Sequence, residues 1–146
     1  MTAKELVHAF AGNPLDKGTS IRHSGDKIDA MKELPFARYL VFQDLKVLTS
    51  DGAIDYVGYR SLPKLRGDQI FLGTLNNVPY FAVQTDDGDF GEFTDCRQVV
   101  RQKDLSQSGI VAQARSMLAW HRKNPFCSRC GNETALERGG QLRRCP

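Results

Sequence analysis

Two cysteines separated by two residues, Cys127 and Cys130, stand near the end of this 146-residue chain. Gly131 follows them directly and permits the tight turn that such a pair requires. Two thiolates at this spacing supply half of a tetrahedral site, and zinc is the ion that proteins most often bind in this way. The pair is therefore interpreted as a zinc knuckle.

A third cysteine lies at the distance expected for the second half of a zinc ribbon. Fourteen residues separate Cys130 from Cys145, and Cys145-Pro146 matches the start of a Cys-Pro-x-Cys knuckle. The candidate metal ligands are therefore Cys127, Cys130 and Cys145. A closed structural zinc site takes four protein ligands, and the sequence stops before the fourth. We therefore expect the chain to be a piece of a longer protein.

Two other uses of paired cysteines fit the sequence less well. A redox Cys-x-x-Cys motif requires a strand-helix-strand context and leaves the third cysteine unexplained. Disulfides would require a secreted chain, but the segment from Thr2 to Phe10 contains Lys4 and Glu5 where a signal peptide is apolar. A reducing, cytoplasmic compartment is expected.

The bulk composition allows one modest domain. With 40% hydrophobic residues the chain can build a single core, and a net charge of +3 is too small to indicate nucleic-acid binding. No apolar run reaches the length that spans a membrane. The charged residues are mixed along the chain, which is typical of a solvated surface.

The hydrophobic pattern predicts an α+β fold. Helical spacing is found over Asp26–Leu34 and Gln107–Lys123, and a short helix or capping turn is predicted within Ala3–Phe10. The region between them is rich in strands, with hairpin turns predicted at Asp51-Gly52 and Asn76-Asn77. Pro79 indicates that its strand begins there or lies at an edge. The sheet is expected to be mixed or antiparallel, with short helices and one long helix leading into an incomplete zinc ribbon.

Several polar residues that could bind ligands are assigned structural roles. Asn13 and Asp16, beside Pro14, are expected to hydrogen-bond local backbone. The acidic run 86–89 lacks the spacing of a calcium loop and is interpreted as a turn. Cys96 stands apart from the other cysteines and is expected to be a free structural thiol. No catalytic and no cofactor-binding residue is predicted in this chain.

Four stretches of the sequence together resemble a known family. They are Phe10–Asp16, Phe71–Leu75, Phe93–Asp95, and Ala112–Lys123 running into Asn124-Pro125-Phe126-Cys127. In this order they closely resemble NADH pyrophosphatases of the Nudix hydrolase superfamily. The resemblance covers nearly the whole chain and breaks off before the catalytic domain of such enzymes.

The resemblance implies a domain division and an activity of the parent protein. Residues 1–123 would form a degenerate Nudix-like domain and residues 124–146 a partial zinc ribbon, with the catalytic Nudix domain absent from this chain. Such enzymes split NAD(H) into nicotinamide mononucleotide and AMP with Mg²⁺ or Mn²⁺ in the catalytic domain, and members of the family also remove NAD caps from RNA. The zinc would be structural, and the parent a homodimer without membrane contact.

The resemblance also bears on the fourth zinc ligand. It places a cysteine two positions beyond Pro146 in that role. His121 is the alternative within this chain, since imidazole can join three thiolates. The resemblance instead assigns His121 and Trp120 to packing at the junction between domain and ribbon.

The residues that Nudix catalysis requires are missing from the sequence. That motif ends in Arg-Glu-x-x-Glu-Glu, because clustered carboxylates must hold divalent cations against a pyrophosphate. The chain contains no Arg-Glu pair and no Glu-Glu pair, so it is predicted to be inactive alone. The alternative function is a stand-alone zinc-ribbon adaptor that binds nucleic acid or protein, with Arg138, Arg143 and Arg144 as phosphate contacts.

Overall fold

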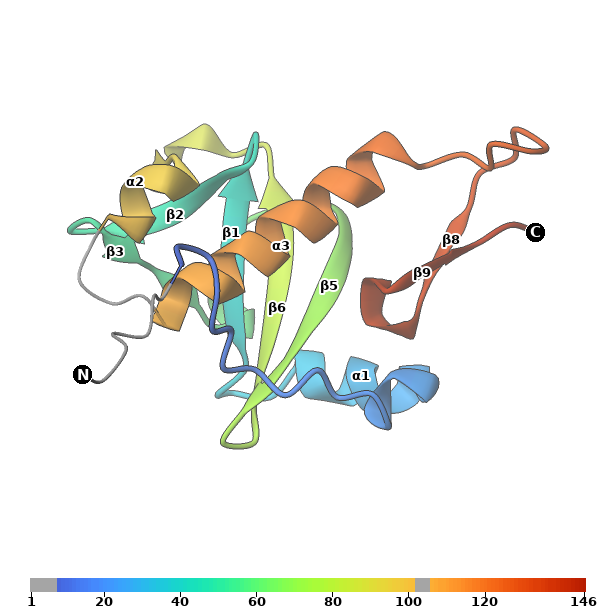
Figure 1. Cartoon of the computed structure of the whole chain (residues 1–146), viewed down its shortest axis with the longest axis horizontal. Helices are drawn as coiled ribbons and strands as arrows, with labels where there is room; N and C mark the ends of the chain where they lie inside the picture. Colours follow the sequence, from blue (N-terminus) through green and yellow to red (C-terminus); the bar gives the residue numbers. More distant parts are fainter. Residues whose placement is uncertain (1–7, 102–105) are drawn as a thin grey trace, which may run out of the picture.

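A twisted β-sheet forms the centre of the molecule (Figure 1). The computed structural model describes residues 8–101 and 106–146. Within these residues seven strands form one sheet with the order β3-β2-β1-β6-β5, to which β4 adds beside β1 and β7 beside β2. Their bounds are β1 Arg38–Gln43, β2 Lys46–Ser50, β3 Ala53–Ile54, β4 Tyr56–Val57, β5 Leu65–Leu75, β6 Val78–Thr85 and β7 Glu92–Thr94. Together with the helices they confirm the α+β fold class.

The sheet is mixed because one interior pair of strands is parallel. β1 runs parallel to β6, from Arg38 opposite Tyr80 to Phe42 opposite Gln84, whereas the other pairs are antiparallel. Asn76 and Asn77 join β5 to β6 at φ 50° and 62°, which confirms the predicted two-residue turn. β6 is an interior strand that begins at Val78, so Pro79 marks a strand start and not an edge.

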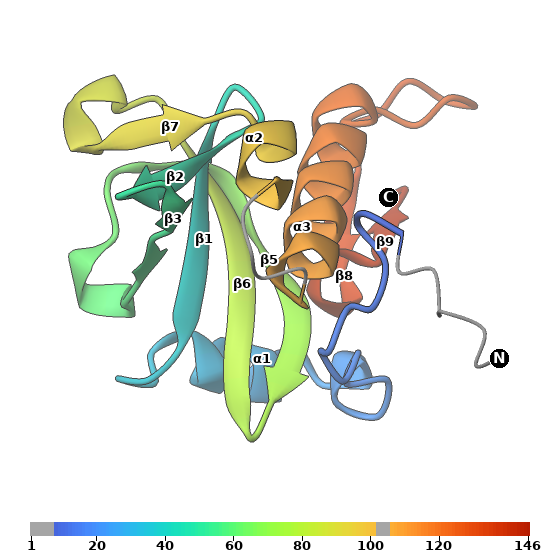
Figure 2. The same cartoon turned by 60° about the vertical axis from the view of Figure 1, so that its left-hand side comes forward.

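Each face of the sheet is covered by its own helix. Along β1, Leu40 and Phe42 belong to the core under α3, whereas Tyr39 and Val41 belong to the core under α1. Helix α3 (Ser106–Lys123) crosses one face and α1 (Gly25–Lys32) lies across the other, as the two views show (Figure 2). This alternation follows from the two-residue period of a strand.

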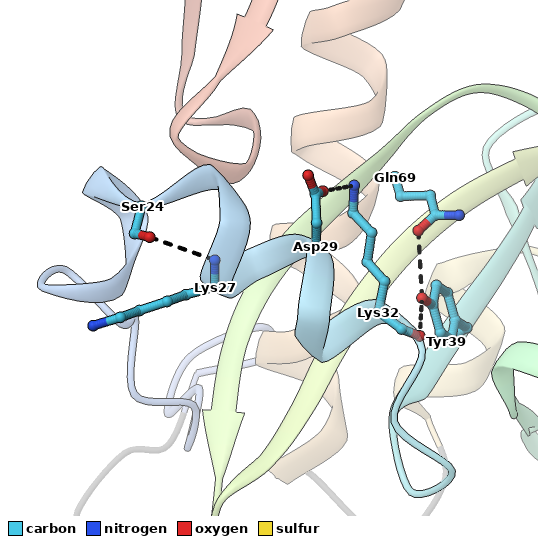
Figure 3. Close-up of polar contacts among 6 residues, drawn as sticks. All are labelled: Ser24, Lys27, Asp29, Lys32, Tyr39 and Gln69. Carbon is cyan, nitrogen blue, oxygen red and sulfur yellow. Dashed lines mark hydrogen bonds and ion pairs between the residues drawn. The ribbon is translucent and has the colours of Figure 1, made fainter.

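Helix α1 is fixed at both ends by side chains (Figure 3). At its start, the Ser24 hydroxyl accepts a hydrogen bond from the Lys27 amide at 3.4 Å. At its end, the Tyr39 hydroxyl donates to the Lys32 carbonyl at 2.8 Å and lies 3.3 Å from Oε1 of Gln69. Burial raises the pKa of Tyr39 far above its usual range, so this hydroxyl stays a donor. The prediction of a helix over Asp26–Leu34 is confirmed within two residues at each end.

The loop before α1 is held against α3 by Asn13. Its Oδ1 accepts from the Leu15 amide at 3.0 Å, and its Nδ2 donates to the Gly109 carbonyl at 3.2 Å and to Oε1 of Gln113 at 2.7 Å. Asp16 Oδ1 accepts from the Gly18 amide at 2.8 Å. The prediction that Asn13 and Asp16 bond local backbone is confirmed, and Asn13 also reaches across the fold.

Short helix α2 (Cys96–Val100) begins with Asp95, whose carboxylate accepts from the Arg97 amide at 2.8 Å. Cys96 is buried and free, as predicted, and burial raises its pKa to about 11.

The helix or turn predicted at the N-terminus falls mostly on residues 1–7, outside the described residues; His8 to Phe10 end in a turn. Among the helices that the structure describes, none combines the length and apolar character needed to cross a bilayer.

Candidate metal centre

The chain leaves α3 and turns tightly around the first two candidate ligands. The Cys127 amide donates to the Asn132 carbonyl and the Gly131 amide donates to the Cys127 carbonyl, both at 2.8 Å. Gly131 has φ +74°, a value that glycine adopts at little cost. These bonds form the knuckle that the sequence predicts between Cys127 and Cys130.

The three cysteines come together at one point. The sulfur atoms of Cys127, Cys130 and Cys145 all lie within 4.8 Å of one another, and those of Cys130 and Cys145 are 3.2 Å apart. Tetrahedral Zn–S bonds of about 2.3 Å place two sulfurs about 3.8 Å apart, so the spacing and the donor type fit a zinc ion. Cys127 is half-buried, and Cys130 and Cys145 are exposed.

The polar surroundings shift the pKa values of Cys127 and Cys145 in opposite directions. Backbone amides of Cys130 and Arg129, helped by the neighbouring thiols, lower the pKa of Cys127 to about 7. Hydrogen bonds to Cys130 and Cys127 raise the pKa of Cys145 to about 12. Cys127 therefore becomes a thiolate, the form that binds metal, at a lower pH than Cys145.

The segment between the second and third ligands is a hairpin that packs on the domain. Strands β8 (Ala135–Glu137) and β9 (Leu142–Arg144) pair antiparallel and enclose the short 3-10 helix η4 (Arg138–Gly140). A Cβ atom built on Gly139 would lie 2.8 Å from Cβ of Phe71, and one built on Gly140 would lie 2.9 Å from Ile70. The hairpin, seen beside β5 in Figure 1, thus approaches the main sheet closely.

His121 connects α3 to this hairpin through both ring nitrogens. Nε2 lies 2.8 Å from the Gly140 carbonyl and Nδ1 lies 2.9 Å from Nη1 of Arg143. Because a carbonyl only accepts and a guanidinium only donates, His121 is neutral with its proton on Nε2. The structure therefore places His121 at the junction between domain and ribbon, and both its nitrogens already have partners other than a metal. Neighbouring Trp120 stacks edge-on against it and is 42% exposed.

Arg22 is a second link to the ribbon, and the sequence patterns did not predict it. Its side chain is buried, and it donates to the carbonyls of Lys17 at 2.6 Å, Phe71 at 3.0 Å and Arg138 at 3.0 Å. Its guanidinium also lies 4.8 Å from the centre of the Phe71 ring. Burial lowers the pKa of Arg22 to about 10. A single arginine between Ile21 and His23 gives no periodic signal from which this role could have been predicted.

Arg143 and Arg144 of the ribbon bond to different partners. Arg144 donates to both carboxylate oxygens of Glu137, at 2.5 and 2.8 Å. Arg143 donates to the hydroxyl and the carbonyl of Thr134, both at 2.7 Å.

In the acidic run 86–89, Asp86 pairs with Arg66 and Asp87 accepts from the Asp89 amide at 3.2 Å, as in an ordinary turn.

Comparison with known proteins identifies the family of the chain. Residues 37–120 match the model of the NADH pyrophosphatase-like rudimentary NUDIX domain. Over 97% of its length the chain is 31% identical to NAD-capped RNA hydrolase NUDT12 of Homo sapiens, covering 41% of that protein. Over 99% of its length it is 27% identical to Nudix hydrolase 19, chloroplastic, of Arabidopsis thaliana, covering 44%.

A shorter match, 32% identical over 56 residues, is to NAD(P)H pyrophosphatase NUDT13, mitochondrial, of Homo sapiens, and covers 38% of this chain and 16% of that protein. The chain thus spans less than half the length of these relatives. The matched region runs from Ala37, just before β1, to Trp120 in α3, and so contains the whole seven-stranded sheet. The chain therefore belongs to the family of NADH pyrophosphatase-like rudimentary NUDIX domains.

Proposed function

We propose that this chain is the N-terminal structural region of a Nudix hydrolase that cleaves the pyrophosphate of NAD(H) to nicotinamide mononucleotide and AMP. The observation that carries the proposal is a rudimentary Nudix domain without the Arg-Glu-x-x-Glu-Glu carboxylates. The chain covers 41% and 44% of two of its relatives, both of which are hydrolases by name. The catalytic carboxylates, with Mg²⁺ or Mn²⁺, would belong to a part of the parent protein outside this chain.

Within this proposal the two parts of the chain have different tasks. Residues 1–123 form the Nudix-like domain, which supports assembly of a homodimer. Residues 124–146 form part of a zinc ribbon in which Cys127, Cys130 and Cys145 hold a structural ion. Zinc bound there would cross-link the knuckle to the end of β9. The free thiols support a reducing compartment, which we propose to be the cytoplasm, although two relatives are named for the chloroplast and the mitochondrion.

A second substrate is suggested by one relative. NUDT12 is named for hydrolysis of NAD-capped RNA, and the same pyrophosphate bond occurs in NAD(H) and in that cap. A stand-alone adaptor is supported less well, because Arg144, one of its three expected phosphate contacts, is already paired with both carboxylate oxygens of Glu137.

The test compares the chain with the product of its complete open reading frame. Residues 1–146 incubated with NADH and Mg²⁺ or Mn²⁺ should release no nicotinamide mononucleotide above a metal-free control. The complete product should release both mononucleotides in a metal-dependent reaction. Hydrolysis by residues 1–146, or none by a longer product that contains a Glu-rich Nudix helix, would contradict the proposal.

A further inference from the structure

A small cavity lies on the seam where the ribbon meets the main domain. Its volume is about 250 Å³, and its walls come from the start of β5, the end of β6, the last turn of α3 and β9. Ligand pockets for drug-sized molecules begin at about 300 Å³, so this cavity suits a small group. We refer to it as the seam cavity.

Three arginines from distant parts of the sequence converge on the seam cavity: Arg66 from β5, Arg122 from α3 and Arg143 from β9. His121 and Gln84 add polar groups, and Asp68 contributes one carboxylate. With three guanidinium groups and Asp68, the lining carries a positive charge at neutral pH.

The present contacts of these arginines leave donors available for a ligand. A guanidinium has five N–H groups. The described contacts of Arg66 use one of them, toward Asp86 at 3.1 Å, and Arg122 is 4.0 Å from Asp44. The side chains of Asp86 and Asp44 are 72% and 76% exposed. Ion pairs on the surface contribute little to stability, so a ligand can replace them at small cost.

Arg143 differs from the other two because it is held in place. Three of its N–H groups donate to Thr134 and His121 at 2.7 to 2.9 Å, which fixes the plane of its guanidinium at the cavity wall. One fixed and two adjustable arginines can surround a small anion from several sides.

The larger groove on the other side of the hairpin provides a contrast. It has a volume of about 970 Å³ and is also lined by basic residues. There Arg144 is bonded to Glu137, Lys32 to Asp29 at 2.8 Å, and Arg22 to backbone carbonyls. Lys32 and Arg144 of this groove are therefore paired with carboxylates and Arg22 is buried against carbonyls, whereas Arg66 and Arg122 of the seam cavity have only exposed carboxylates as partners.

We propose that the seam cavity binds a phosphate group, supplied either by a free phosphate compound or by the backbone of an RNA strand. Planar arginines recognise phosphate oxygens through paired N–H bonds, and the cavity has room for one such group. The test of this proposal measures binding and not hydrolysis.

The test is an NMR titration of the purified chain at low ionic strength, following the backbone amides of Gly67 and Gln84 at the cavity wall. One arm adds inorganic phosphate and the other adds a short RNA oligonucleotide. In the variant with Arg66→Gln and Arg122→Gln, affinity should fall roughly tenfold for each charge-assisted hydrogen bond lost. Arg143 is left unchanged because it supports the hairpin. Arg60→Gln is the matched control, since Arg60 is exposed and does not line the cavity.

Each outcome decides the proposal. Saturable binding of phosphate identifies a free compound as the source, and saturable binding of RNA alone identifies the strand, provided that the double variant weakens it and the control does not. Absence of saturable shifts in both arms would overturn the proposal. The proposal would also be overturned if the double variant bound with the same affinity as the wild type. The same holds if Arg60→Gln lost as much affinity as the double variant. Matching melting temperatures of the three proteins show that the comparison is between folded chains.

Discussion

Gly109 shows how a single hydrogen atom sets the distance between α3 and the loop before α1. A Cβ atom at this position would lie 2.7 Å from the amide nitrogen of Asn13 and 2.8 Å from its Cα. Both are backbone atoms and cannot rotate away. The usual preference of helices for alanine over glycine is therefore reversed here by a steric clash.

We predict that Gly109→Ala lowers the free energy of unfolding by about 1–3 kcal/mol, as overpacked substitutions typically do. Gly25→Ala is the matched control, because Gly25 also lies in a helix but a Cβ atom added there would meet nothing within 4 Å. Gly25→Ala should leave the free energy of unfolding unchanged or raise it slightly. Urea denaturation of the three proteins measures the difference, and equal stability of the two variants would show that the loop can move aside.

At the scale of helices and strands, the sequence predicted helices and turns better than it predicted which strands pair in the sheet. Periodicity and turn chemistry located α1, α3 and the turn at Asn76-Asn77, because these features are determined within a few residues. The parallel pairing of β1 with β6 could not be predicted this way, since it joins segments about forty residues apart. The spacing of Cys127, Cys130 and Cys145 predicted a cluster, and their sulfurs meet, but it carried no information on where the ribbon packs.

The hairpin β8–β9 is joined to α3 by a hydrogen bond that depends on protonation. Burial lowers the pKa of His121 below its usual value; Arg143 lowers it further, while the Gly140 carbonyl and Asp68 act in the opposite direction. The unfolded chain therefore binds a proton first as the pH falls. The stability contributed by neutral His121 is complete above about pH 6.5 and is lost below it.

We predict that the unfolding free energy of the wild type falls more steeply between about pH 7 and about pH 5 than that of His121→Gln, which does not titrate there. The difference between the two proteins isolates His121 from the other groups that titrate in this range. Thermal or urea unfolding across the pH series measures it. Parallel curves would mean that protonation does not disturb the contact with Arg143.

At the scale of the whole molecule, the core lies upstream of the metal centre. The largest fully buried side chains, such as Tyr39, Phe42 and Phe81, come from the main sheet. The ribbon adds contacts at its tip, through Arg138 to Arg22 and through Gly139 to Phe71. Loss of zinc should therefore lower the free energy of unfolding while the main sheet stays folded.

We predict that EDTA lowers the free energy of unfolding of the zinc-loaded chain by about 1–3 kcal/mol while the transition remains cooperative. Circular dichroism should retain the signal of the sheet. Cys130→Ser, which removes one thiolate, is the control and should respond little to EDTA. Complete collapse of the wild type on chelation would instead mean that the entire fold depends on the metal.

The parallel contact between β1 and β6 also has a consequence for the speed of folding. The β5–β6 hairpin closes through two asparagines and can form in microseconds, since its partners are neighbours along the chain. β1 can pair with β6 only after the long segment between them has formed a closed loop. Closing this loop lowers the conformational entropy of the chain before the β1–β6 hydrogen bonds stabilise it. We therefore expect refolding on the slow, millisecond-to-second scale of chains with distant contacts, with attachment of β1 as the step that limits the rate.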